Sequence, residues 1–359
     1  MRARRRIHEL MLLAIAACTL TAALGGCSLF LDHEAVIDVD VVEGVVPLTI
    51  RFDGCRSTGS SGIESYRWRF GNGDESFDAS GTYTYLHAGS FPLTLTVRGF
   101  DGETRTTSVQ IEVKACIWLA DASLGKVYKL GLDGQLVTEF DAPAASPHGV
   151  AIVESGGAWR LYVACQGGGF PGIYRIDPGT GTVVSELPAP AQAPLSLAYG
   201  GDAPRRVWHV DGTSRKIYEL NPGDLLVLGS FGSSYFYATG QVAEIGLLRA
   251  PAGLAWTREE PTPGVLWYLE GSTQLLYRIR IVPPSSILGG LQLTVDGEGV
   301  PLDPSVFPVT GMDWYEGYLW VVDADHAQVV QIDPATGRKT GAAVVELPGA
   351  NAAGLTFQK

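Results

Sequence analysis

The sequence predicts an all-β protein in which a β-sandwich is followed by a β-propeller. A short strand pattern recurs from residue 117 to residue 357, whereas longer alternating strands occupy residues 35–113. In both regions β-branched and aromatic residues are separated by Gly, Pro and Asp, which is typical of strands joined by turns. Residues 1–26 follow neither pattern and are treated as an export segment.

Residues 251–280 show the recurring unit most completely. They hold a first strand (GLAW), a second strand that ends in an acid (VLWYLE), a polar turn and a third strand (LLYRIR). The second strands of the successive copies are IWLAD, LYVAC, VWHVD, LWYLE and LWVVD, so we expect five blades. Such a sheet buries both faces only against neighbouring sheets, which favours a propeller. A degenerate copy of this unit within residues 285–307 would make six blades.

The order of the copies predicts how the propeller closes. The region begins with a second strand at residues 117–121 and ends with a first strand at residues 354–357. We therefore expect this C-terminal strand to supply the innermost strand of the first blade, which removes an open edge.

Two connections between third and fourth strands share a turn signature, DPGTG from Asp177 and DPATG from Asp333. Proline presets φ at the second turn position and glycine accepts a positive φ at the end. With the run GSFGSSYFYATGQVAEIGLLRAPAGLAW from Gly229, these turns make the region similar to the NHL, YVTN and SMP-30-like propeller families. The resemblance implies a fold rather than a reaction.

Residues 1–26 have the layout of a signal peptide, because four arginines at positions 2, 4, 5 and 6 precede an apolar run over residues 10–24. The following tetrad Leu24-Gly25-Gly26-Cys27 resembles the bacterial lipobox, which implies an acylated Cys27. We expect residues 27–34 to be a lipidated tether, with Ser28 favouring the outer membrane. A plain signal peptide with an incidental cysteine is the alternative.

The chain carries 26 basic and 38 acidic residues, a net charge of -12. Removing residues 1–26 removes four arginines and Glu9, which leaves 22 bases, 37 acids and a net charge of about -15. An acidic body argues against a nucleic-acid partner and against electrostatic docking on anionic lipid. The expected membrane contact is therefore the acyl chains.

Residues 35–115 form the expected first domain, and residues 116–359 the propeller. The segments Trp68-Arg69-Phe70-Gly71-Asn72-Gly73 and GSFPLTLTV from Gly89 resemble a PKD domain, which implies an immunoglobulin-like sandwich acting as a stalk. On the first segment we expect Trp68 and Phe70 inside and Arg67 and Arg69 outside. Some PKD domains bind calcium, but the loop at residues 57–62 has no carboxylate.

Three cysteines lie beyond the expected lipid site, at Cys55, Cys116 and Cys165. We expect all three to be buried small residues rather than partners in a disulfide.

One face of the propeller collects the candidate site residues, because the ends of second strands and the starts of first strands emerge together there. His148 stands where the other blades have Leu195, Ala252, Thr310 and Ala353. Acids end four of the second strands and an aromatic insertion lies nearby; the candidates are Asp121, Asp211, Glu270, Asp323, Tyr235 and Tyr237.

Two interpretations of the acids remain open. In SMP-30-like enzymes such carboxylates hold a divalent metal, so the resemblance implies that a cation such as calcium could bind at the propeller mouth. Alternatively the acids accept hydrogen bonds from their own turns, as Asp often does before Gly. His148 could likewise be an ordinary surface residue, and the tyrosines could anchor their own loop.

Neither a nucleophile elbow nor an HExxH motif nor a phosphate loop occurs in the sequence. The leading hypothesis is therefore an outer-membrane lipoprotein whose propeller is a non-catalytic platform for a protein or glycan, without a cofactor. A metal-dependent hydrolase, lactonase or lyase and a scaffold for envelope assembly are the alternatives.

Overall fold

The computed structural model of the chain describes residues 33–155, 157–167, 171–201, 205–224, 226–231, 237–238, 250–259, 264–282, 292–348 and 352–359. These residues form strands and turns without any α-helix, so the all-β prediction is confirmed for the described part of the chain. Within that part, no helix is long and apolar enough to cross a bilayer. The chain divides into two compact units, each described by itself: one holds Ile50–Tyr83 and Phe91–Ile111, and the other holds Glu112–Lys359 with Glu43–Thr49 and Thr84–Ser90.

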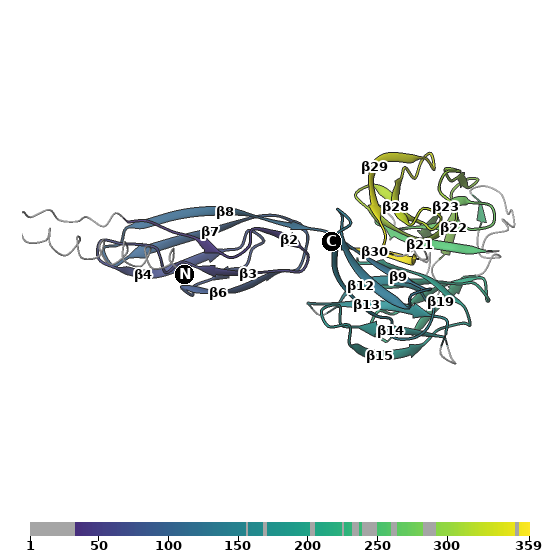
Figure 1. Cartoon of the computed structure of the whole chain (residues 1–359), viewed down its shortest axis with the longest axis horizontal. Coiled ribbons are helices and arrows are strands. Elements are labelled where there is room, and N and C mark those ends of the chain that lie inside the picture. The colour runs from purple at the N-terminus through teal and green to yellow at the C-terminus, as the bar shows by residue number, and fades with distance from the viewer. Residues whose placement is uncertain are drawn as a thin grey trace, which may run out of the picture. The chain divides into compact units, whose positions relative to one another are not determined.

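Two sheets lie in the N-terminal part of the chain (Figure 1, purple to blue). The smaller sheet has the order β1 (Asp38–Val39), β3 (Leu48–Asp53), β6 (Ser80–Tyr85). The larger has the order β2 (Glu43–Val45), β8 (Thr104–Lys114), β7 (Gly89–Gly99), β4 (Ile63–Arg69), β5 (Glu75–Ser76).

The aromatic core of this sandwich is centred on Trp68. Trp68 and Phe70 are buried, and both rings contact Phe52, with centroid separations of 4.8 and 5.4 Å. The intervening side chains point outward, where Arg67 and Arg69 both form ion pairs with Glu75. The expected alternation is therefore confirmed.

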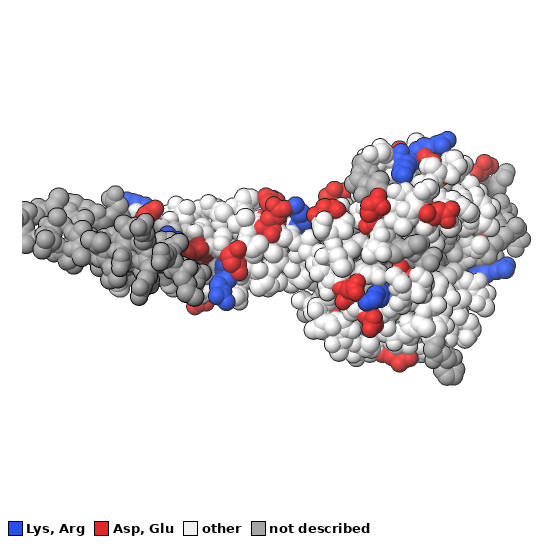
Figure 2. All heavy atoms as spheres, viewed as in Figure 1, with Lys and Arg blue, Asp and Glu red and all other residues white. Residues whose placement is uncertain are grey.

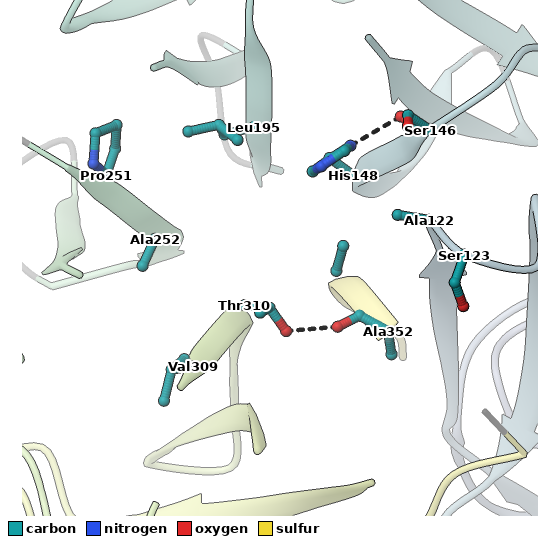
Figure 3. Close-up of a pocket in the computed structure, with 11 residues that line it drawn as sticks. Ala122, Ser123, Ser146, His148, Leu195, Pro251, Ala252, Val309, Thr310 and Ala352 are labelled. Atoms are coloured by element: carbon teal, nitrogen blue, oxygen red, sulfur yellow. Dashed lines mark hydrogen bonds between the residues drawn. The ribbon is translucent and has the colours of Figure 1, made fainter. Parts of the chain in front are cut away.

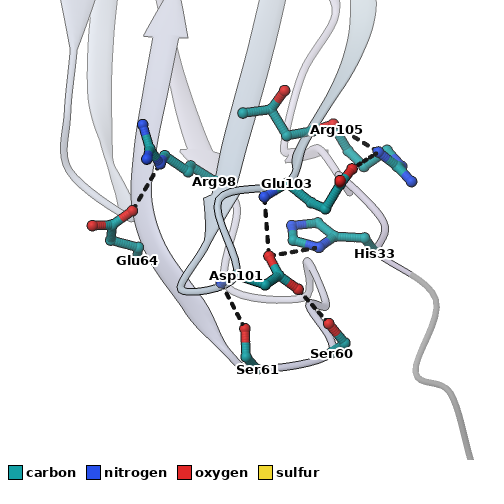
Figure 4. A network of polar contacts seen from close by, with 9 residues as sticks. His33, Ser60, Ser61, Glu64, Arg98, Asp101, Glu103 and Arg105 are labelled. Atoms are coloured by element: carbon teal, nitrogen blue, oxygen red, sulfur yellow. Dashed lines mark hydrogen bonds and ion pairs between the residues drawn. The ribbon is translucent and has the colours of Figure 1, made fainter.

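A polar cluster holds two loops together at one end of the sandwich (Figure 4). The carboxylate of Asp101 accepts hydrogen bonds from the Ser60 hydroxyl and, at 3.0 Å, from the Glu103 amide. The Asp101 amide donates to the Ser61 hydroxyl, also at 3.0 Å. The bond from Ser60, followed by that from the Glu103 amide, lowers the pKa of Asp101. The carboxylate-free loop at residues 57–62 is thus fixed by hydrogen bonding to the β7–β8 turn.

The second unit consists of consecutive sheets, in each of which the strands follow one another from one edge to the other. One sheet joins the two ends of the region: β11 (Leu136–Asp141), β10 (Lys126–Gly131), β9 (Cys116–Asp121), β30 (Ala352–Gln358). Two more follow: β12 (Pro147–Ser155), β13 (Ala158–Cys165), β14 (Gly172–Ile176), β15 (Val183–Pro188), and then β16 (Pro194–Gly200), β17 (Arg206–Asp211), β18 (Lys216–Leu220), β19 (Val227–Phe231).

The remaining two sheets complete this region. The first has the order β20 (Tyr237–Ala238), β24 (Gln292–Val295), β23 (Leu275–Val282), β22 (Val265–Glu270), β21 (Pro251–Thr257), with β25 (Val300–Pro301) also on β23. The last is β26 (Val309–Tyr315), β27 (Tyr318–Asp323), β28 (Gln328–Ile332), β29 (Lys339–Glu346). The described part of residues 285–307 therefore adds strands β24 and β25 to the sheet of β23.

Apolar side chains fill the space between successive sheets, which explains why the second strands are continuous apolar runs. β9 and β22 are buried along their whole length, whereas the outer strands β11 and β15 alternate toward solvent. Residues of successive sheets belong to the same buried apolar cluster, for example Tyr162 and Val207, Trp208 and Leu266, Trp267 and Val321, and Val322 and Leu119.

The last strand, β30, pairs antiparallel with β9, with Leu355 opposite Leu119 and Gln358 opposite Cys116 (Figure 1). The innermost strands also contact one another in the cyclic order β12, β16, β21, β26, β30 and back to β12. Glycine permits the closest approaches: a Cβ on Gly354 would collide with the His148 carbonyl oxygen, and one on Gly311 would lie 2.9 Å from the Gly354 Cα.

The cysteine expectation is only partly correct. Cys116 and Cys165 are buried and Cys55 is exposed, all three as free thiols. Cys55 lies in the turn after β3, where its amide donates to the Asp53 carboxylate at 2.7 Å. This turn lies at the surface, so the residue adds nothing to the core.

Candidate functional site

Each first strand of the second unit has a β-bulge near its start. The pairing register shifts there in β12, β16, β21, β26 and β30. A bulge leaves a residue unpaired and turns its side chain to a new direction. The residues at the five shifts are those that the repeat alignment made equivalent: His148, Leu195, Ala252, Thr310 and Ala353.

These five residues surround one cavity of about 510 Å³, which we call the strand-start cavity (Figure 3). Its other lining residues are Ala122, Ser123, Ser146, Pro251, Val309 and Ala352. The bulges thus place one side chain from every innermost strand around a common space.

His148 supplies the imidazole of the strand-start cavity. Its Nδ1 lies 2.8 Å from the Ser146 carbonyl oxygen, which also accepts the Gln166 amide at 3.1 Å. Because a carbonyl only accepts, Nδ1 must carry the proton, and the Nε2 of a neutral ring is then an acceptor. Ser146 has a φ of 53°, a conformation that costs a non-glycine residue about 1 kcal/mol or more. The backbone therefore fixes the orientation of this ring.

The rest of the lining is mainly apolar. Leu195, Pro251 and Val309 contribute hydrocarbon surface. The Thr310 hydroxyl donates to the Ala352 carbonyl oxygen (Figure 3). The Ser123 hydroxyl donates to the Asp121 carboxylate at 2.7 Å. A small apolar cavity with a single imidazole suits a ligand with an apolar body and one hydrogen-bonding group.

The four candidate acids are buried beside the turns that follow them. Oδ1 of Asp121 accepts the amides of Ser123 and Leu124, both at 2.9 Å, and Oδ1 of Asp211 accepts those of Thr213 and Ser214 at 2.9 and 2.7 Å. Each carboxylate thus serves its own turn, which is the second interpretation that the sequence left open.

Glu270 and Asp323 follow the same arrangement with different donors. Burial alone would raise the pKa of Glu270, but hydrogen bonds from Thr273 and Ser272 outweigh it and lower that pKa. Oε1 of Glu270 also accepts the amide of Ala250, the residue before its neighbouring first strand, at 3.0 Å. The corresponding residue beside Asp323 is Pro308, which has no amide proton. Asp323 Oδ2 instead lies 2.8 Å from His326 Nδ1 and 3.0 Å from Gln328 Nε2.

The acids and His148 do not converge on a metal site. Within the described ranges, no group of three or more His, Cys, Asp and Glu side chains is placed to hold a metal ion. The carboxylates lie in separate turns, and each accepts at least one hydrogen bond from an amide of its own turn. Among the described residues, Oδ2 of the buried Asp121 has no partner.

Cys27 and Tyr235 lie outside the described residues, as does the whole signal segment. Tyr237 lies on β20, which pairs parallel with β24 opposite Thr294.

Sequence reasoning assigned no role to the opposite ends of the innermost strands. Four of the five first strands bring an aromatic residue to or near this end: Tyr199, Trp256, Trp314 and Phe357. That recurrence was present in the repeat alignment and could have indicated a second cluster of aromatic side chains at these strand ends.

Charged side chains are interspersed on the face of the second unit that Figure 2 shows. Acidic groups outnumber basic ones in that view, and the described residues on it form no broad basic area.

Residues 38–113 match the model of the PKD domain. The chain is 36% identical over 87 residues to the pre-pro-metalloprotease PrtV of Vibrio cholerae, an alignment that covers 24% of this chain and 9% of that protein. It is 37% identical over 83 residues to collagenase ColA of Clostridium perfringens, with 23% and 7% covered. The chain thus spans less than a tenth of the length of either relative.

Two solved structures are also similar. The PKD1 domain of Vibrio cholerae PrtV is 34% identical, covers 22% of this chain and 93% of its own, and has a TM-score of 0.20. A chain of the nidogen/laminin complex is 14% identical, covers 68% of this chain and 98% of its own, and has a TM-score of 0.44. The family match and the sequence similarity to PrtV support a PKD domain at residues 38–113, as the Trp68 and Gly89 segments predicted.

Proposed function

We propose that this chain is an exported lipoprotein in which a PKD stalk presents a five-bladed β-propeller, closed by β30, as a non-catalytic binding platform. The observation that carries the binding role is the strand-start cavity, where five equivalent bulges surround one oriented imidazole. A protein or glycan partner inserts an apolar group there and bonds to Nε2 of His148.

The closed propeller is supported by strand pairing and packing. β30 completes the sheet of β9, and the innermost strands contact one another cyclically. Successive sheets share apolar clusters, which is how propeller blades bury their faces. The described part of residues 285–307 belongs to the sheet of β23, which favours five blades over six.

Export and anchoring are supported by the sequence and by the PKD match. The four early arginines, the apolar run and the Cys27 tetrad agree with an acylated export signal. PKD domains in the bacterial relatives PrtV and ColA are consistent with a location in the envelope or outside the cell. Stable attachment to a bilayer needs about two acyl chains, which an acylated Cys27 would supply.

A metal-dependent hydrolase is less well supported, because the candidate carboxylates are hydrogen-bonded within separate turns. Alternatively, the binding platform serves as a scaffold for envelope assembly. Identifying the protein that binds to it would distinguish this role.

Site-specific photocrosslinking tests the platform. A benzoylphenylalanine at Ala252, inside the cavity, is expected to give a discrete crosslinked product in cells, whereas the same group at exposed Leu136 is not. The His148→Ala substitution should remove at least 80% of the Ala252 product, because it deletes the oriented acceptor. Equal products from both positions, or a product that His148→Ala leaves unchanged, would contradict a ligand in this cavity.

Anchoring has a separate test. Metabolic labelling with an alkynyl fatty acid should mark the wild-type chain, and Cys27→Ser should abolish the label and release the protein from membranes. Labelling that persists in the variant would exclude Cys27 as the lipid site.

A further inference from the structure

The innermost strands also enclose a cavity of about 240 Å³ at their opposite ends, which we call the strand-end cavity. Its lining comes from the C-terminal ends of β12, β16, β21, β26 and β30, together with His87, Trp159 and Gly201. The lining residues that carry the argument are Glu154, Tyr199, Trp256, Asp313, Thr356, Phe357 and Lys359. None of these residues lines the strand-start cavity. It is large enough for a ligand the size of one sugar ring.

Aromatic rings form one side of the strand-end cavity. Trp256 and Tyr199 are half-buried, and the Tyr199 hydroxyl donates to the Glu154 carbonyl oxygen at 3.2 Å. The indole of Trp256 lies against two glycines: a Cβ on Gly264 would collide with its Nε1, and one on Gly200 would lie 3.2 Å from its Cε2. Close packing of this kind holds the indole in one orientation. The rings therefore form a rigid apolar surface that is open on one side.

Asp313 provides the acceptor of the strand-end cavity. Its Oδ2 accepts the Phe357 amide at 2.8 Å and the Thr356 hydroxyl at 3.1 Å, and its Oδ1 accepts the Trp314 amide at 2.7 Å. Burial raises the pKa of this carboxyl, while the charge of Lys359 and these hydrogen bonds oppose the rise. A carboxylate oxygen has two lone pairs, so Oδ1 retains one for a ligand hydroxyl.

Lys359 provides the donor. Its Nζ donates to the Trp314 carbonyl oxygen at 2.8 Å and lies 5.9 Å from the centre of the Tyr315 ring. These contacts place the ammonium group at the cavity, and an ammonium has three protons to donate. A donor and an acceptor thus stand beside an aromatic surface.

The combination excludes several ligand classes. A cation would meet Lys359, and an anion would meet Asp313 and Glu154, each at a cost in repulsion and desolvation. A wholly apolar ligand would displace water from Asp313 without offering the carboxylate a hydrogen bond in return. A neutral ring with an apolar face and several hydroxyls satisfies all three surfaces, because hydroxyls both donate and accept.

We propose that the strand-end cavity is a binding site for one neutral sugar ring, which stacks on Trp256 and bonds to Asp313 and Lys359 through its hydroxyls. This site does not depend on the partner of the strand-start cavity. It gives the propeller two faces with different ligands.

Saturation-transfer NMR on the full chain in detergent tests the proposal. The probes are the methyl β-glycosides of glucose, galactose, mannose and N-acetylglucosamine, with tetramethylammonium as the competing ligand class. We expect transfer to the ring protons of at least one glycoside. Trp256→Leu should weaken its binding at least tenfold and Lys359→Ala about threefold, because each removes one of the contacts described above.

His148→Ala is the matched control, since it alters only the other cavity and should leave glycoside binding unchanged. Circular dichroism and thermal melting establish whether Trp256→Leu remains folded, and Lys359→Ala, at an exposed position, provides the second variant. The proposal is overturned if none of the four glycosides shows transfer or if tetramethylammonium alone binds. It is also overturned if binding survives both strand-end substitutions or is lost in His148→Ala.

Discussion

The strand-start and strand-end cavities are built from the same five strands, yet their chemistry differs. At the starts, bulges present His148 among small aliphatic side chains. At the ends, regular pairing presents Trp256 and Tyr199 with a carboxylate and an ammonium group. Between the two levels the strands approach closely at Gly149, Gly253, Gly311 and Gly354. A repeated strand can therefore serve two ligands when close packing at its middle separates its ends.

The sheet of β16, β17, β18 and β19 maintains that middle level without a glycine. Its first strand has Ser196 at the equivalent position, and the Ser196 hydroxyl accepts the Leu254 amide of the next innermost strand at 3.1 Å. The Ser196 carbonyl oxygen lies 3.1 Å from Nδ1 of the buried His209. A side-chain bond and a buried imidazole thus replace the glycine contact in this sheet.

Gly354→Val should have the largest effect on this arrangement. The added side chain would collide with the His148 carbonyl oxygen, so β30 or β12 must move. We expect the free energy of unfolding to fall by about 3 kcal/mol in urea titrations, because overpacking at this contact cannot relax locally. The matched control is Gly201→Ala, whose Cβ would meet its nearest neighbour at 3.5 Å and should change stability by less than about 0.5 kcal/mol. Equal stability of the two variants would show that the middle level is not tightly packed.

His209 should make stability depend on pH. Burial lowers the pKa of this imidazole to about 4. The unfolded chain takes up a proton below about pH 6.5, whereas the folded chain does not until about pH 4. The contribution of His209 is therefore fully present above pH 6.5 and is lost as the pH falls toward 4.

His209 changes the free energy of unfolding by at most about 1.4 kcal/mol per pH unit. By pH 5, about 2 kcal/mol of that free energy should therefore be lost. Urea unfolding at pH 7, 6 and 5 measures it, and His209→Gln should remove that part of the dependence. Parallel pH profiles for the variant and the wild type would mean that His209 is not buried in the neutral form.

Asp211→Asn should have the smallest effect and should separate the two interpretations of the acids. The asparagine oxygen can still accept the Thr213 and Ser214 amides in place of Oδ1, but its NH2 group cannot accept the Ala193 amide that bonds to Oδ2, at a cost of about 1 kcal/mol. Photocrosslinking from Ala252 should be unchanged, because the carboxylate serves the turn. Loss of the crosslink with full stability would instead make Asp211 a ligand residue.

The repeat grammar was sufficient to predict strand order, the equivalence of His148 with Leu195, Ala252, Thr310 and Ala353, and the return of the last strand to the first sheet. It could not decide the role of Asp211 or Glu270, because an acid before a turn has the same sequence whether it accepts amides or holds a cation. The aromatic residues at the strand ends could be read from the sequence, but an aromatic residue buried in the core would give the same pattern. The prediction that Cys55 is buried was wrong, because the solvent exposure of a turn residue depends on neighbouring segments. The sequence of a single strand does not reveal those segments.

The central claim is that β30 closes the propeller by pairing with β9, and a disulfide tests it most directly. Gln358 lies opposite the native Cys116 in the antiparallel register. Directly opposite residues have Cα atoms about 4.5–5.5 Å apart, within the range that a disulfide spans. Gln358→Cys in a Cys55→Ser background should therefore crosslink to Cys116 under mild oxidation, whereas Lys359→Cys, whose side chain points the other way, should not. Peptide mapping that finds the introduced cysteine of Gln358→Cys bonded to Cys116 would support the closed propeller, and a failure of Gln358→Cys to crosslink while Lys359→Cys does so would contradict it.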